Sequence, residues 1–68
     1  MSSTPMELIR KLDETASALR ELASQVRRAA PEVDDEALRA EMLESAAGLE
    51  RRANDLTEAV TGLRVKIN

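Results

Sequence analysis

Residues 9–30 of this chain read IRKLDETASALRELASQVRRAA, and residues 42–63 read MLESAAGLERRANDLTEAVTGL. In both stretches apolar residues recur at alternating steps of three and four positions. This spacing places one apolar stripe along each of two helices, and such a stripe is buried against another helix. The pattern predicts an all-α fold. The recurring residues are Ile9, Leu12, Ala16, Leu19, Ala23, Val26 and Ala30, followed by Met42, Ala46, Leu49, Ala53, Leu56, Val60 and Leu63.

The ends of the predicted helices follow from capping and helix-breaking residues. The segment TPME at residues 4–7 fits a capping box, with Thr4 as the N-cap and Glu7 at the third helical position. Pro31 disfavours the α conformation of the residue before it, so the first helix is expected to end at about residue 29. Asp34 is the expected N-cap of the second helix, because its carboxylate can accept hydrogen bonds from the free N–H groups of the first turn.

The end of the second helix is open to two interpretations. Gly62 could close it as a C-cap, whereas Leu63 and Ile67 continue the heptad pattern. We expect helix to persist to about residue 63 and to fray beyond it. A turn this short forces the two helices to pack side by side in an antiparallel hairpin. The predicted organisation is one helical-hairpin domain over 1–68, with helices at about 5–29 and 35–63, a turn at 30–34 and a tail at 64–68.

The heptad positions a to g describe how each residue faces the seam between the helices. Alanine occupies most a positions, and leucine, valine and methionine occupy the d positions. Small and large layers of this kind interdigitate in a four-helix bundle. Because the chain has no Phe, Tyr or Trp, one hairpin alone would bury too little surface, and we expect a homodimer. The expected core and dimer interface consists of Ile9, Leu12, Ala16, Leu19, Ala23, Val26, Met42, Ala46, Leu49, Ala53, Leu56 and Val60.

The alanine and leucine pattern from Thr4 to Leu63, together with the acidic turn, resembles the repressor-of-primer (ROP) family. This resemblance implies a homodimer of two helical hairpins. It also implies binding of paired RNA loops through one face of the bundle, as ROP does with polar, basic and aromatic groups. The segment LESAAGLERRA at residues 43–53 is similar to short bacterial hairpin proteins as well, a resemblance that implies no function.

The residue types that carry most catalysis and metal binding are absent. The chain has no Cys and no His, which excludes thiolate nucleophiles and imidazole ligands. Asp34, Asp35 and Glu36 stand at a helix start, where capping by Asp34 and compensation of the helix dipole by the two carboxylates after it account for them. Glu7, Glu14 and Glu21 form a row at the outermost position f, where a carboxylate stays solvated. The sequence therefore predicts no enzyme activity, no cofactor and no bound metal.

The expected location follows from the absence of targeting signals in the sequence. No basic segment followed by an apolar run opens the chain. No apolar stretch approaches the ~20 residues of a membrane-spanning helix. We expect a cytoplasmic protein that does not enter a membrane.

Five arginines are candidate contacts for a protein partner or a nucleic acid: Arg20, Arg27, Arg28, Arg51 and Arg52. Carboxylates are interspersed with them, and the net charge of −3 opposes the continuous positive surface that phosphate binding needs. The chain also has no aromatic side chain to stack on an unpaired base. We therefore expect local ion pairs on a solvated surface, and these features argue against nucleic-acid binding.

Two groups of residues beside the a and d positions leave alternatives open. The leucines that flank the a and d positions either complete the wide apolar face of each helix or mark a groove for a partner helix. Gly48 and Gly62 both fall at position c. Either another chain approaches the helix closely at these glycines, or the helix tolerates the small loss of stability that each glycine causes. The flanking leucines are Leu8, Leu22, Leu38 and Leu43.

The sequence favours a non-enzymatic interaction or adaptor protein that acts as a homodimeric helical bundle and binds a protein partner. Two alternatives remain. One is a ROP-like RNA-binding regulator, and the other is a subunit of a hetero-oligomeric helical assembly.

Overall fold

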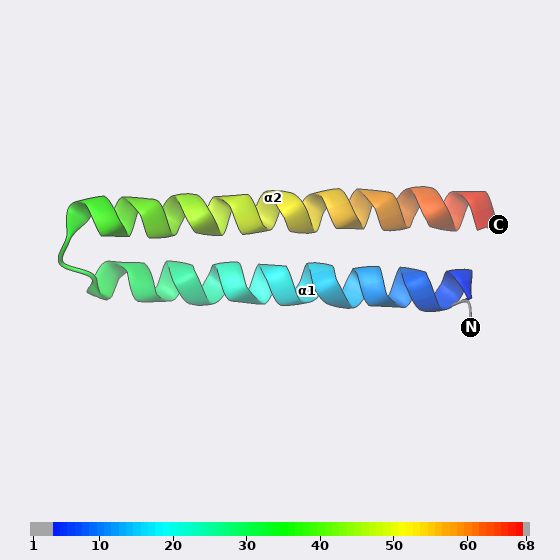
Figure 1. Cartoon of the computed structure of the whole chain (residues 1–68), viewed down its shortest axis with the longest axis horizontal. Helices are drawn as coiled ribbons and strands as arrows, with labels where there is room; N and C mark the ends of the chain where they lie inside the picture. Colours follow the sequence, from blue (N-terminus) through cyan, green and yellow to red (C-terminus); the bar gives the residue numbers. More distant parts are fainter. Residues whose placement is uncertain (1–3, 68) are drawn as a thin grey trace.

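The computed structural model describes residues 4–67, which form two long antiparallel helices joined by a tight connection (Figure 1). Helix α1 spans Pro5–Ala29, a single 3₁₀ turn η1 spans Ala30–Glu32, and helix α2 spans Glu36–Ile67. The described part of the chain contains helices and no strand. The all-α hairpin predicted from the apolar spacing is confirmed.

Helix α1 begins and ends at residues whose chemistry accounts for both boundaries. Thr4 is extended, and its Oγ1 accepts a hydrogen bond from the backbone N–H of Glu7 at 3.1 Å, which satisfies one of the free donors of the first turn. At the other end the helix stops at Ala29, and Pro31 lies within η1. The N–H of Val33 then donates to the carbonyl of Ala30 at 3.1 Å. The chain turns within these few residues.

The N-cap of α2 is Asp35, one residue later than the predicted Asp34, which is corrected here. Oδ1 of Asp35 accepts hydrogen bonds from the N–H groups of Ala37 at 2.9 Å and Leu38 at 3.3 Å. The two adjacent aspartates have equal capping propensity. Because η1 takes up three residues and Val33 is extended, the first free N–H groups of α2 fall within reach of Asp35.

Helix α2 continues to Ile67, four residues beyond the expected end at residue 63. The proposed tail at 64–68 is therefore helical as far as Ile67, and residue 68 lies outside the described residues. Gly62 has no positive φ, so it does not form the left-handed cap that would close the helix. The ion pair of Arg64 with Asp13 of α1, at 2.8 Å, ties this last stretch to the other helix.

Alanines at position a dominate the seam between the helices. Ala23, Ala46 and Ala53 are fully buried, and among residues 4–67 Ile9 and Val60 are the only large side chains in the buried set. Because small side chains separate the two backbones, the helices can approach each other closely. The residues at position d, in contrast, are only half-buried. The buried residues are Ile9, Ala16, Ala23, Ala30, Ala46, Ala53 and Val60.

We expect Ala23→Leu to lower the free energy of unfolding by roughly 1–3 kcal/mol, because extra methylene groups at a filled seam force the helices apart. Ala23 has no exposed surface. The matched control is Ala40→Leu, since Ala40 is exposed on α2 and should change stability by less than about 0.5 kcal/mol. Urea unfolding followed by circular dichroism measures both variants. Equal effects at the two positions would show that the seam does not run along the a positions.

Candidate functional site

The two sides of the alanine seam differ in chemistry. In an α-helix, position e lies on one side of a, and positions d and g lie on the other side. We call the e positions, together with Asn54 beside them, the polar flank. We call the d and g positions the leucine face. The leucine face comprises Leu12, Leu19, Val26, Met42, Leu49, Leu56 and Leu63 at d, with Leu8, Leu22 and Leu38 at g.

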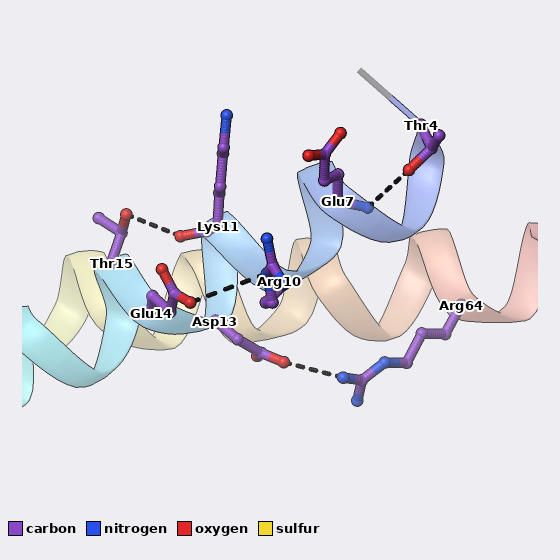
Figure 2. Close-up of polar contacts among 8 residues, drawn as sticks. All are labelled: Thr4, Glu7, Arg10, Lys11, Asp13, Glu14, Thr15 and Arg64. Carbon is purple, nitrogen blue, oxygen red and sulfur yellow. Dashed lines mark hydrogen bonds and ion pairs between the residues drawn. The ribbon is translucent and has the colours of Figure 1, made fainter.

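Hydrogen bonds and ion pairs cross between the helices on the polar flank. Nη2 of Arg64 donates to Oδ2 of Asp13 at 2.8 Å, and Figure 2 shows the arginine side chain extending along the hairpin to reach that carboxylate. One heptad further along α1, Nη2 of Arg20 donates to Oγ1 of Thr57 at 2.7 Å and to Oδ1 of Asn54 at 3.2 Å. The hydroxyl of Thr57 in turn donates to the carbonyl of Ala53 at 3.0 Å. Long polar side chains thus bridge this side of the seam.

The third crossing on the polar flank is a two-pronged ion pair between Arg27 and Glu50. Nε of Arg27 donates to Oε2 of Glu50 at 3.3 Å, and Nη2 donates to Oε1. Each side chain keeps 43% of its exposure. The hydrogen bond from Arg27, aided by its positive charge, lowers the pKa of Glu50, and the same contact raises the pKa of Arg27. The geometry favours ionisation of both groups, although exposed pairs contribute little to stability.

The three polar side chains of the polar flank on α1 stand in one row. Asp13, Arg20 and Arg27 are seven residues apart, and so are Glu50, Thr57 and Arg64 on α2. Asp13 of the α1 row pairs with Arg64 of the α2 row, and Glu50 of the α2 row pairs with Arg27 of the α1 row. We did not identify this flank from the sequence. The complementary e positions were the signal that could have revealed it.

The leucine face remains open along the hairpin. Its d side chains are half-buried, and the three g leucines are more exposed, at 48% for Leu8, 46% for Leu22 and 47% for Leu38. Charged side chains lie at its edges, where α1 contributes Lys11 at position c. On α2, Glu41 and Asp55 at c border the face, and Arg52 and Lys66 are charged residues at the g positions of the face itself. An apolar strip bordered by charges is typical of a surface that binds another protein.

The five candidate arginines are divided among three sides of the hairpin. Arg20 and Arg27 belong to the polar flank, where carboxylate, amide and hydroxyl oxygens accept their hydrogen bonds. Nε of Arg28 donates to the carbonyl of Ser24 in its own helix at 3.4 Å. Arg51 and Arg52 line a hollow on α2. The structure therefore does not bring the five side chains together into one basic patch.

The described residues 4–67 contain no cluster of three or more acidic side chains that could hold a metal ion. Within the same range, neither helix is long and apolar enough to cross a membrane. In comparisons with known proteins, no protein family, no curated protein and no solved structure gives a significant match. The resemblance to ROP thus rests on the hairpin architecture and the heptad pattern.

We expect the Arg27–Glu50 pair to stabilise the hairpin at neutral pH and to lose this effect in acid. Because the folded state lowers the pKa of Glu50 below its ordinary value of 4.5, the contribution is complete above that value and disappears as the pH falls through the lowered pKa. Thermal melts of the natural chain and of Glu50→Gln should therefore differ by a small amount at neutral pH and converge in acid. A constant difference across the whole pH range would contradict this linkage.

We expect no binding of generic RNA or DNA tighter than roughly 10⁻⁴–10⁻⁶ M at physiological salt. Arg20 and Arg27 are already hydrogen-bonded across the seam, and dispersed charges release few counterions together. Fluorescence anisotropy with duplex, hairpin and single-stranded probes measures the affinity. Submicromolar binding that weakens with salt and is lost in Arg51→Glu/Arg52→Glu would instead favour the ROP-like alternative.

Proposed function

We propose that this chain is a non-enzymatic interaction protein that acts as a homodimeric four-helix bundle. Two hairpins would join through their leucine faces, and their outward-facing polar surfaces would then bind a protein partner. The observation that carries the proposal is the difference between the two sides of the seam. Polar side chains bridge one side, whereas the other leaves a row of apolar d side chains half-buried on each helix.

The small core of one hairpin supports association with a second copy. Within the described part of the chain, five of the seven buried side chains are alanines, which bury one methyl group each, and only Ile9 and Val60 are large. A chain of this size reaches adequate stability when it buries more apolar surface than such a seam provides. The half-buried d side chains supply that surface, because a second leucine face placed over them would exclude water from both.

The dimensions of the hairpin also suit a stable dimer. Its long side measures 50 by 21 Å, an area of about 1,000 Å², and a standard stable interface buries roughly 800 Å² per partner. A hairpin side of this size is therefore large enough for a stable interface. In the bundle, the polar flank would remain on the outside, available to a partner that carries complementary charges.

We expect a solution mass near twice 7.5 kDa and a melting temperature that rises with protein concentration, because folding and association are then coupled. Leu22→Glu should shift the protein towards monomer, since it places a charge within the leucine face. Leu43→Glu is the matched control. Leu43 is 40% exposed, close to the 46% of Leu22, but it lies at position e on the polar flank. Analytical ultracentrifugation over a range of concentrations measures the association of both variants.

Two results would contradict a homodimer joined through the leucine faces. One is a well-folded monomer whose melting temperature is independent of concentration. The other is equal association of Leu22→Glu and Leu43→Glu, which would show that the leucine face is not the interface. Association with a protein partner is tested separately, by capturing partners on the tagged dimer and comparing the Arg27→Glu variant with the natural chain.

A further inference from the structure

We infer that a hollow on α2, formed by Ser45, Gly48, Leu49 and Arg52, is the hole that receives a leucine from α1 of a second copy. This inference rests on the proposed function, because it assigns where the two leucine faces interlock.

The spacing of the four residues is that of a coiled-coil hole. They stand at positions i, i+3, i+4 and i+7 of one helix, which is the set of four side chains that surrounds an inserted knob. They line a hollow of about 500 Å³ whose remaining walls are Arg51 and Asp55. The hollow lies close to the middle of α2, which spans Glu36–Ile67. Two hairpins that overlap along most of their length would therefore cover it.

Gly48 keeps the hollow open, although the hairpin itself does not require a glycine there. Its φ is not positive, so its backbone suits any residue. A Cβ built at this position would meet only Nη2 of Arg51, at 3.7 Å, which is an ordinary contact. Glycine weakens a helix relative to alanine. The hairpin alone would accept a larger residue at position 48. The presence of glycine there is explained if a side chain of another copy occupies the space.

Two leucines of α1, together with the glutamate before each of them, suit the hollow and its basic rim. Leu8 and Leu22 are the two large apolar side chains at position g of α1, and both are about half exposed. Each directly follows a glutamate, Glu7 or Glu21. A leucine inserted beside Leu49 would bring this glutamate towards Arg51 and Arg52 at the rim. The apolar knob and the neighbouring carboxylate thus complement the hole and its basic edge.

Filling the hole tests the inference on the full chain. We expect Gly48→Leu to weaken dimerisation by about 10–100-fold, because an added side chain overpacks an occupied site, while helix content at concentrations that saturate the dimer stays the same or increases. Thr61→Leu is the matched control. It adds the same side chain to the exposed outer side of α2, where Thr61 bonds only the carbonyl of Thr57 in the contacts observed. Sedimentation measures the association constant, and circular dichroism measures the helix content.

Disulfide trapping identifies the side chain that enters. Because the chain has no natural Cys, a mixture of Gly48→Cys with Leu8→Cys or Leu22→Cys forms mixed disulfides only between copies. We expect trapping with one of these two partners and none with Leu43→Cys.

The outcomes separate this inference from the proposed function. A dimer that is weakened by Gly48→Leu, unaffected by Thr61→Leu and trapped by the Gly48→Cys variant supports both. A natural chain that dimerises while Gly48→Leu and Thr61→Leu associate equally well overturns the hole and leaves the homodimer standing. A natural chain that stays monomeric at all concentrations overturns the homodimer and the hole with it.

Discussion

Close packing of two helices across a row of alanines is the constraint on which the rest of this structure depends. With Ala16, Ala23, Ala46 and Ala53 at the centre of the seam, the backbones approach closely and little apolar surface is buried between them. Of the larger side chains, Ile9 and Val60 are buried in this seam, whereas those at the d and g positions are not. They remain beside it, half-covered. The same feature that defines the hairpin therefore leaves its apolar surface incompletely buried.

The two sides of the seam differ in how their side chains are covered. On the polar flank, arginines bridge the helices to carboxylate, amide and hydroxyl groups. Such exposed contacts add little free energy, but they fit only one alignment of the two helices and so favour a single register. On the other side, leucines lie along both helices without a comparable cover. This asymmetry is the basis for assigning one side to association and the other to the outer surface.

The proposed bundle links this local chemistry to function without catalysis. Two leucine faces joined together would complete the core that one hairpin lacks, and the hollow around Gly48 would give the contact a defined alignment. The polar flank would then be displayed on two opposite surfaces of a symmetric dimer. A small protein of this kind would present fixed rows of charges to a partner.

The sequence alone determined the two helices and their antiparallel pairing, because apolar spacing, Pro31 and the short connection act locally along the chain. It also placed the start of α1 at Thr4. It did not show that only the a positions would be fully buried within the hairpin while the d positions stay half-buried. Only the tertiary structure decided between Asp34 and Asp35 as the cap, since both have the same intrinsic propensity and the path of η1 selects one. The tertiary structure also decided that α2 continues to Ile67 and which residues the arginines contact. Arg64, Arg20 and Arg27 find partners on the opposite helix, and these contacts depend on how two distant segments pack against each other.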